Sequence, residues 1–198
     1  MTRPLILASG SAARAALLRQ AGVRFDVEAA PVDEAAIKAS LLAEGAPPRD
    51  VADVLAELKA CRVASSRPEA LVLGADQVLV CEGRMLDKPA DLDDARSQLV
   101  FLRGKAHELL SAAVIFEDGA PIWRHVGRAQ LVMRPFSDAF LDAYLADDPG
   151  ILDCVGAYRL EASGSQLFSR VQGDYFSVLG LPLLEVLGLL RTRGVCVE

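Results

Sequence analysis

The chain has 198 residues, 52% of them hydrophobic, and a formal net charge of −6. This composition can bury a substantial core, as one domain or as two tightly fused lobes. An acidic chain without a run of Lys or Arg disfavours a general nucleic-acid surface. No apolar stretch approaches the roughly 20 residues of a membrane span.

The N-terminus and the cysteines favour a reducing cytoplasm. The first apolar run, residues 5–8, is too short for the apolar region of a signal peptide. The cysteines lie far apart without CxxC spacing, and only two histidines accompany them: Cys61, Cys81, Cys154, Cys196, His107 and His125. We therefore expect neither a zinc site nor a disulfide framework.

The first apolar run ends in Ser9-Gly10-Ser11, and a helical Ala/Leu-rich stretch, residues 12–21, follows at once. Free backbone N–H groups and the positive end of the helix dipole meet at such a turn. Together with two hydroxyls and the guanidinium of Arg14, the turn can cradle phosphate oxygens. The alternative is that Ser11 only caps the helix and Arg14 is solvated.

Strand and helix signals then alternate, which is typical of an α/β fold. In chain order we expect a strand over residues 23–29, helices over 33–44 and 49–65, strands over 71–80 and 84–86, a helix over 91–102, a hairpin of strands over 107–116 and 121–133, and helices over 137–145 and 182–193. We find no internal repeat and no low-complexity linker, so residues 1–198 are expected to form one domain.

The helix over residues 49–65 is amphipathic. Its expected buried face carries Val51, Val54, Leu55, Leu58 and Cys61. Lys59 falls on the polar side of this helix, where a lysine is usually solvated.

Two acidic positions can carry chemistry. Asp76 follows Gly74-Ala75 in an apolar strand, the kind of setting that presents a carboxylate to a metal or to a reacting proton. The alternative is a strand-end Asp that caps the next turn. Asp33-Glu34 can bind a hard cation through oxygen, or can cap the following helix.

Lys88 precedes Pro89, which restricts the lysine to extended backbone, and such a lysine is usually solvated. His107 lies among small apolar residues and is expected to be a satisfied structural histidine. The patterns GxxxxGK[ST], GxGxxG, HExxH and GxSxG are absent from the sequence. Their absence argues against the common kinases, dehydrogenases, zinc proteases and serine hydrolases.

Several short motifs occur in order along almost the whole chain. They are residues 5–11 with Arg14 and Leu17-Leu18, Asp33-Glu34, Leu58-Lys59-Ala60, Gly74-Ala75-Asp76, Lys88-Pro89, Leu102-Arg103-Gly104 with His107, Gly156-Ala157-Tyr158, Gly173-Asp174-Tyr175 and residues 178–183. The ordered set resembles the Maf-like nucleotide pyrophosphatase family. Each motif alone is weak evidence, whereas the set is highly specific.

The resemblance implies an α/β fold of the inosine triphosphatase type, with an elongated mixed sheet flanked by helices and two lobes around a central cleft. It also implies cleavage of nucleoside triphosphates to monophosphate and pyrophosphate with a divalent cation, Mg²⁺ or Mn²⁺. The family's catalytic base falls on Asp76, and its cleft residues fall on Ser9, Ser11, Arg14, Glu34, Lys59 and Lys88.

We expect Asp76 and Glu34 to contact the metal, and Asp76 can serve as general base, as metal ligand or as both. The sequence departs from the family pattern at two points. Ala12-Ala13-Arg14 stands where the family commonly has Pro-Arg-Arg or Pro-aromatic-Arg, which affects base selection. Asp87 replaces the more usual Gly before Lys88.

Gln77 and Glu161 are the residues expected to select the base of the nucleotide. The family branch that acts on 7-methyl-GTP resembles this chain in having Gln and Glu there, whereas the branch that acts on dTTP and UTP has Thr and Gln. The carboxylate of Glu161 suits the paired N–H donors of a guanine edge. Ala13 stands where the methylguanine branch tends to carry an aromatic ring. We expect 7-methyl-GTP to be preferred over dTTP and UTP, in the house-cleaning of non-canonical nucleotides.

Two other functions stay open. Members of this family have been linked to septum formation, so one alternative is a nucleotide-binding regulator of cell division without turnover. A phosphatase that releases single phosphates is disfavoured because no DxDxT motif is present. The expected partner is a nucleoside triphosphate, with no nucleic acid and no membrane, and a homodimer is left open.

Overall fold

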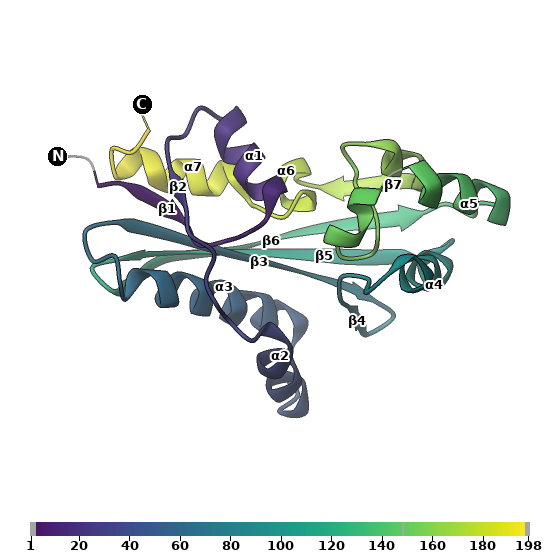
Figure 1. Cartoon of the computed structure of the whole chain (residues 1–198), viewed down its shortest axis with the longest axis horizontal. Coiled ribbons are helices and arrows are strands. Elements are labelled where there is room, and N and C mark those ends of the chain that lie inside the picture. Colours follow the sequence, from purple (N-terminus) through teal and green to yellow (C-terminus); the bar gives the residue numbers. More distant parts are fainter. Residues whose placement is uncertain (1–2, 148, 197–198) are drawn as a thin grey trace. The chain divides into compact units, whose positions relative to one another are not determined.

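The structure is a computed structural model that describes residues 3–147 and 149–196. Its elements are, in chain order, β1 (Leu5–Leu7), α1 (Ala12–Gln20), β2 (Asp26–Val27), α2 (Glu34–Ala43), α3 (Pro48–Ala64), β3 (Leu71–Cys81), β4 (Arg84–Leu86), α4 (Leu92–Leu102), β5 (Ala106–Glu117), β6 (Ala120–Met133), α5 (Asp138–Asp147), the 3₁₀ helices η1 (Pro149–Asp153) and η2 (Ser163–Leu167), β7 (Phe168–Gly173), α6 (Tyr175–Val178) and α7 (Leu183–Thr192) (Figure 1).

The strands form one mixed sheet of seven strands. Its order is β2-β1-β3-β5-β6-β7, and β4 pairs with β3 beside this path. β1 runs parallel to β2 and β3, whereas β4 and β7 are antiparallel to their neighbours. The expected α/β class, with a mixed sheet flanked by helices, is confirmed.

The chain divides into two compact units. Unit 1 comprises Met1–Gln77, Ser111–Gly127 and Gly180–Glu198, and unit 2 comprises Val78–Leu110 and Arg128–Leu179. The long strands β3, β5 and β6 therefore contribute residues to both units.

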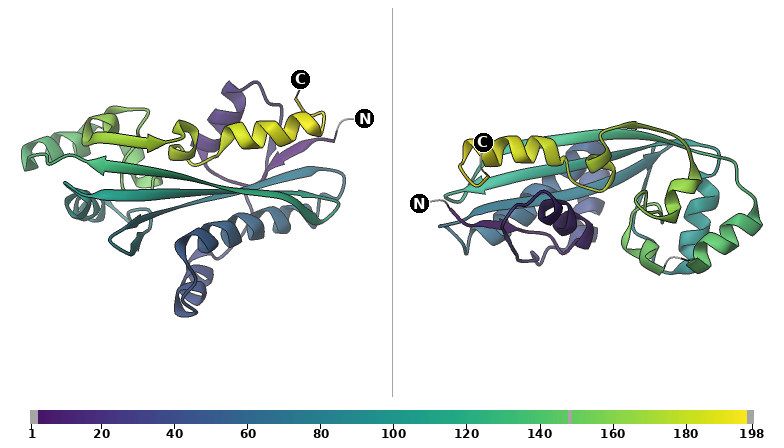
Figure 2. Two further views of the ribbon diagram at one scale, coloured as in Figure 1. Left: turned by 180° about the vertical axis from the view of Figure 1, so that it is seen from behind. Right: turned by 90° about the horizontal axis from the view of Figure 1, so that it is seen from above.

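In unit 1 the sheet is covered on both faces. α3 lies along one face, and α1 and α7 lie on the other (Figures 1 and 2). In β3, residues 71–76 are accordingly all buried, unlike a strand with one wet face. The largest buried side chains of this unit are Leu5, Leu7, Leu18, Leu55, Leu71, Leu73 and Ile115.

Gly74 decides how α3 packs on the sheet. A side chain at this position would place its Cβ 2.1 Å from the carbonyl oxygen of Ala56 and 2.7 Å from the backbone nitrogen of Ala60. The helix backbone therefore rests directly on β3, and the small side chains of α3 make this approach possible.

This packing corrects the expected buried face of α3. Val51 and Leu55 are buried, as expected, but Val54 is only half-buried, and Leu58 and Cys61 are exposed. The face that meets the sheet is instead Val51, Ala52, Leu55, Ala56, Lys59, Ala60, Val63 and Ala64. Lys59 does not lie on the polar side of α3, as was expected, and the alternative that it is a solvated lysine was wrong, because small alanines line the face of α3 that packs on the sheet.

In unit 2 the sheet has one covered face. Arg128 and Gln130 of β6 are exposed, whereas Ala129, Leu131 and Met133 are buried in strict alternation. α4 packs against α5 and η1. The core cluster of this unit is Leu79, Cys81, Leu86, Ala95, Leu99, Leu102, Leu109, Ala129, Leu131, Met133, Phe136, Leu141, Tyr144, Ile151, Ala157, Tyr158, Leu167 and Val178.

Two expected strand assignments need correction. The strand expected over residues 23–29 shrinks to the two residues of β2, because its neighbour β1 pairs with it only through Ile6 and Leu7. β7 was not expected, because its sequence is polar and all but its first residue are exposed. The remaining expected elements agree with the structure to within a few residues at their ends.

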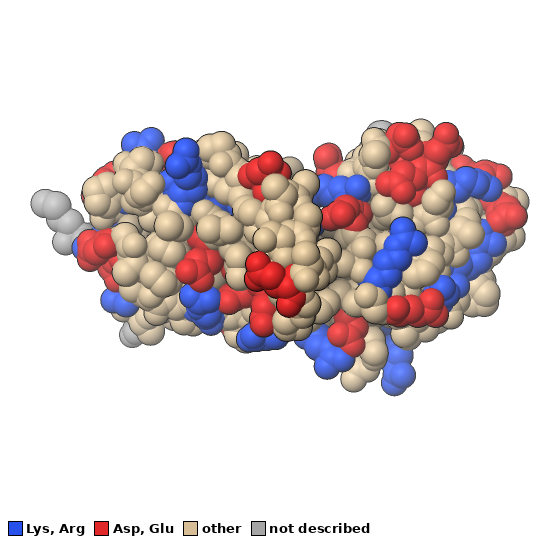
Figure 3. Space-filling view, turned by 90° about the horizontal axis from the view of Figure 1, so that it is seen from below, with Lys and Arg blue, Asp and Glu red and all other residues tan. Residues whose placement is uncertain are grey.

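Within the described part of the chain, none of the helices is both long and apolar enough to cross a lipid bilayer. Basic and acidic side chains are interspersed over the face shown in Figure 3. This mixture of charge offers no continuous basic footprint on that face.

Candidate active site

The register between β1 and β3 positions the turn that follows β1. Leu7 pairs with Leu73, and the backbone N–H of Ala8 donates to the carbonyl of Leu73 at 2.8 Å. Because the two strands are parallel, the residues that follow β1 advance beside those that follow Leu73. Ser9 therefore comes level with Ala75, one residue before Asp76.

The turn is organised by its two serines. Ser9 Oγ accepts a hydrogen bond from the backbone N–H of Ser11 at 3.3 Å. Ser11 Oγ accepts from the backbone N–H of Arg14 at 3.4 Å, so Ser11 is the N-cap of α1. Ala13 is half-buried in the first turn of this helix.

Arg14 is buried, so the alternative that this side chain is solvated was wrong. Its guanidinium donates to Gly180 O at 2.8 Å, and to Ser9 Oγ and Ala75 O at 3.0 Å each. Burial lowers the pKa of the Arg14 guanidinium, and the charges of Asp76 and Glu34 act in the opposite direction. The positive charge of Arg14 therefore lies within electrostatic reach of both carboxylates.

A lysine bridges two carboxylates at the centre of the site. Lys59 Nζ lies 2.7 Å from Oδ1 of Asp76 and 2.9 Å from Oε1 of Glu34. The lysine comes from α3, Asp76 from β3, and Glu34 from the first residue of α2. Asp33 caps α2 by accepting from the backbone N–H of Ala36 at 3.1 Å. Asp33 therefore caps the helix, whereas Glu34 lies at the site. The sequence had left both roles open for this pair of acids.

The two carboxylates of this bridge differ in their exposure. The side chain of Asp76 is 7% exposed, whereas that of Glu34 is 45% exposed. Oδ2 of Asp76 is buried and has no hydrogen-bond partner among the described residues. A buried carboxylate oxygen in this state needs a partner, so it marks where a ligand, a metal ion or a water binds.

The arrangement fits a divalent cation that shares its ligands with a substrate. No group of three His, Cys, Asp or Glu side chains within residues 3–147 and 149–196 could hold a metal by itself. Mg²⁺ is commonly bound through one or two carboxylates together with phosphate oxygens and water. Asp76, with its unpartnered oxygen, and Glu34 supply such a pair.

Gln77 follows Asp76 and is half-buried. Its Nε2 donates to Oγ of Ser111 at 2.9 Å. Neither Ser111 nor Gly180 was expected at the site. Both lie far along the chain, Ser111 in β5 and Gly180 in the turn before α7, and only the tertiary fold brings them to Gln77 and Arg14.

The other two expected site residues, Lys88 and Glu161, belong to unit 2. Lys88 is exposed, and Arg159 Nε donates to Oε1 of Glu161 at 3.2 Å. Burial raises the pKa of the nearby Cys154 thiol to about 11, with Glu161 acting in the same direction and Arg159 and Lys88 against it. The charges of Glu161, Arg159 and Lys88 therefore each lie within electrostatic reach of Cys154.

His107 is a structural residue in unit 2. Its Nε2 lies 2.8 Å from the hydroxyl of Tyr158, and its ring packs against Tyr158 and Phe168. Burial lowers the pKa of His107 to about 4. The expectation of a satisfied histidine is only half correct, because Nδ1 finds no hydrogen-bond partner in the described residues.

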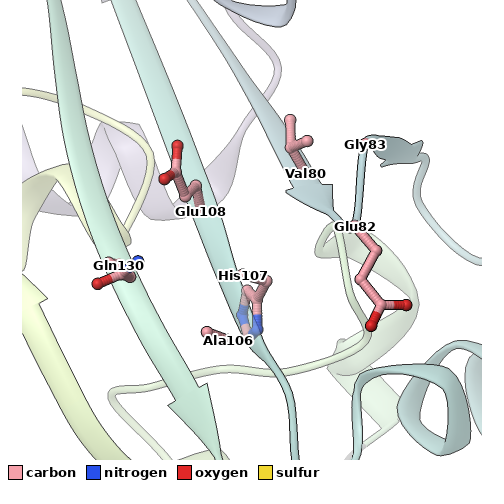
Figure 4. Close-up of a pocket in the computed structure, with 7 residues that line it drawn as sticks. All are labelled: Val80, Glu82, Gly83, Ala106, His107, Glu108 and Gln130. Carbon is pink, nitrogen blue, oxygen red and sulfur yellow. The ribbon is translucent and has the colours of Figure 1, made fainter.

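A pocket of about 280 Å³ also lies in unit 2. It is lined by Val80, Glu82, Gly83, Ala106, His107, Glu108 and Gln130 (Figure 4). Its acidic side chains have basic partners, Lys105 for Glu82 and Arg128 for Glu108. We therefore do not place the active site in this pocket.

Fold and site together define an α/β protein with a carboxylate–lysine–carboxylate site beside the first parallel strand pair. The chain belongs to the Maf-like protein family, whose family model matches residues 4–193. A nucleoside triphosphate pyrophosphatase of Ruegeria pomeroyi is 54% identical over 196 residues, which is 98% of each chain. Proteins of the same name from Ruegeria sp. (strain TM1040) and Caulobacter vibrioides are 55% and 52% identical, over 98% and 96% of each chain.

Proposed function

We propose that this protein is a hydrolase that cleaves the α–β phosphoanhydride of nucleoside triphosphates and releases a nucleoside monophosphate and pyrophosphate. The observation that carries the proposal is the buried Asp76 carboxylate, with Oδ1 held by Lys59 and Oδ2 without a partner in the described chain. The names of the full-length relatives support the same reaction.

In this proposal, Asp76 Oδ2 accepts the proton of the water that attacks phosphorus. Lys59 fixes the carboxylate by binding Oδ1, so that Oδ2 points to the reacting atoms. Glu34 would hold a divalent cation, Mg²⁺ or Mn²⁺, joined by Asp76 where that carboxylate acts as metal ligand and not as base. The cation would offset the negative charge of the phosphate oxygens. Positioning and charge stabilisation supply most of the rate enhancement, as in other phosphoryl transfers.

The turn after β1 contributes the phosphate cradle. Ser9 and Ser11 close the turn, and the first-turn N–H groups of α1 lie at the positive end of the helix. By its match to the family pattern, Lys88 of unit 2 is proposed as a further phosphate contact. Lys59 and Lys88 also offset substrate charge.

For the base we propose 7-methylguanine. By their match to the family pattern, Gln77 and Glu161 are proposed to recognise it, and Ala13 stands where that branch of the family tends to carry an aromatic ring. Two acceptor oxygens on Glu161 suit two adjacent N–H donors, and methylation at N7 makes the ring cationic, which strengthens the pairing. A dTTP or UTP pyrophosphatase is the alternative within the same reaction class. The proposed role is the removal of non-canonical nucleotides.

The deciding experiment identifies the product. The purified protein is incubated with 7-methyl-GTP, GTP, dTTP, UTP and ATP, with Mg²⁺ or Mn²⁺ and with a chelator. The proposal expects equal amounts of monophosphate and pyrophosphate, and loss of turnover in the chelator. Orthophosphate as the only inorganic product would identify a phosphatase. Binding without turnover of any nucleotide would favour the regulator.

A further inference from the structure

Arg14 joins three segments of unit 1 that are far apart in the sequence. Its Nη1 donates to Ser9 Oγ in the turn after β1 and to the carbonyl of Ala75 in β3, both at 3.0 Å. Its Nε donates to the carbonyl of Gly180, just before α7, at 2.8 Å. A guanidinium with several donors in one fixed plane is suited to hold three acceptors at once.

Two of these contacts bear directly on the surroundings of Asp76. The carbonyl of Ala75 belongs to the peptide unit that carries the backbone nitrogen of Asp76, so binding this carbonyl fixes the plane from which the catalytic side chain projects. Ser9 Oγ also accepts from the N–H of Ser11, so Arg14 supports the whole phosphate turn through one hydroxyl.

The contact with Gly180 depends on the backbone conformation that glycine allows. Gly180 has a φ of +97°, a conformation that side chains rarely allow. A Cβ at this position would lie 3.4 Å from Nε and 3.7 Å from Nη2 of Arg14, and 3.8 Å from Oε1 of Gln77. The backbone of Gly180 therefore packs against the guanidinium and the Gln77 amide together.

We propose that Arg14 is a positioning residue that acts through Asp76 and the phosphate turn, and that Gly180 is its partner in this role. Nε and Nη1 are both committed to protein acceptors, so the guanidinium connects three segments of the fold. The kinetic part of this inference rests on the proposed pyrophosphatase activity.

The kinetic test uses Arg14→Met, Arg14→Lys and Gly180→Ala. We expect kcat to fall about 10–100-fold in Arg14→Met, with little change in KM, because small misplacements of reacting groups cost rate before they cost binding. Gly180→Ala should reproduce this pattern from a position 166 residues away in the chain. Arg14→Lys should recover only part of the rate, since one ammonium cannot reach all three acceptors in the same geometry.

A double variant and a matched glycine sharpen the test. The double variant that combines Arg14→Met and Gly180→Ala should have a kcat no lower than that of the slower single variant, because both changes disrupt the same contact. Gly194→Ala introduces the same kind of strain, at a φ of +69°, where a Cβ would meet nothing within 4 Å. It should therefore keep the wild-type kcat.

Amide hydrogen exchange tests the positioning role of Arg14 without any turnover of substrate. Arg14→Met and Gly180→Ala should both speed exchange in peptides that cover the turn after β1 and residues 74–77. If the wild type hydrolyses no nucleotide, the proposed function fails while this measurement still decides the role of Arg14. Should Arg14→Met fail to fold, Arg14→Lys and Gly180→Ala carry the comparison.

The inference is overturned if Arg14→Met raises KM at unchanged kcat while Gly180→Ala keeps wild-type kinetics and exchange. That pattern would make Arg14 a direct phosphate ligand.

Discussion

Lys59 Nζ lies 2.7 Å from Asp76 Oδ1, and both side chains are buried. Their meeting depends on the close approach of α3 to β3 at Gly74, which lies two residues before Asp76 in the strand. A buried lysine and a buried carboxylate stabilise each other only as a pair, because either charge alone would be costly to bury. The packing of the fold and the chemistry of the site are thus coupled.

Asp76→Asn should lower kcat by about 10²–10⁴-fold and leave the protein folded, because an amide keeps the shape of the side chain but cannot take up the proton. Initial rates of pyrophosphate release and the thermal midpoint measure the two effects. Asp33→Asn is the matched control, since asparagine also caps helices and Asp33 lies outside the Lys59 bridge. Asp76→Asn activity above about one tenth of wild type would remove Asp76 from the role of base.

Lys59→Met should destabilise the metal-free protein, because it removes the ammonium that bridges the carboxylates of Asp76 and Glu34. Removing one partner of a buried pair typically costs about 3–5 kcal/mol, and the exposure of Glu34 favours the lower end. Millimolar Mg²⁺ should restore part of the loss by binding the two carboxylates. Urea unfolding with and without Mg²⁺ measures both effects.

The control for this variant is Lys105→Met, which removes the partly exposed lysine paired with Glu82. It should cost less than about 1 kcal/mol and should gain nothing from Mg²⁺. If Lys59→Met is as stable as wild type without metal, the buried bridge is not a stabilising feature of the protein.

Gly74→Ala should be strongly destabilising. The added Cβ would lie 2.1 Å from the Ala56 carbonyl oxygen, so α3 must move away from β3 at a cost of about 1–3 kcal/mol or more. Because α3 carries Lys59, kcat should fall with stability. Gly188→Ala in α7 places a Cβ where nothing lies within 4 Å, so it should be neutral or slightly stabilising. Equal midpoints for the two variants would contradict the direct backbone contact.

His107 should make stability depend on pH. Its pKa is lowered to about 4 in the folded protein, from an ordinary value of 6.5. Between these values the unfolded chain binds more protons than the folded one, so stability falls as the pH falls from 6.5 towards 4. From pH 7 to pH 5 the expected loss is about 2 kcal/mol.

His107→Gln should remove this part of the pH dependence, since glutamine can still bond to the Tyr158 hydroxyl and does not titrate. Urea midpoints at pH 7 and pH 5 measure it, with His125→Gln as the control for losing a histidine. A wild-type slope in His107→Gln would show that another group sets the acid sensitivity.

The sequence predicts most of the fold, because its helices begin and end at local signals. Ser11, Asp33 and Asp91 each accept a hydrogen bond from the backbone three residues on, as their cap positions predict. The turn Glu82-Gly83 likewise joins β3 and β4 as expected. β7 carries no such signal, since its exposed polar residues have no alternation.

At the site, the sequence identifies residue types but not their contacts. The burial of Lys59 follows from Gly74 and the alanines of α3, whose effect appears only when helix and strand pack together. The contacts of Arg14 with Gly180 and of Gln77 with Ser111 join residues 166 and 34 positions apart, and no local pattern marks such pairs. Local propensity determines elements, whereas these contacts depend on the tertiary arrangement.

Glu161→Gln should change which base the enzyme prefers. The carboxylate offers acceptors only, whereas an amide offers one acceptor and one donor, so a guanine edge loses one of its two matched bonds. We expect wild type to have a higher kcat/KM for 7-methyl-GTP than for UTP or dTTP. In Glu161→Gln the value for 7-methyl-GTP should fall by about 1–3 kcal/mol in transition-state stabilisation, while that for UTP falls less.

The chain offers a closely matched control for this change. Glu108 is also paired with an arginine, Arg128, and its side chain is 31% exposed, against 30% for Glu161. Glu108→Gln therefore removes the same charge from the same unit at a position with no proposed contact to the base, and the substrate ranking should persist. Competition assays with 7-methyl-GTP, dTTP and UTP on all three proteins give the ranking directly. A wild-type preference for dTTP, or an unchanged ranking in Glu161→Gln, would exclude Glu161 as the residue that selects the base.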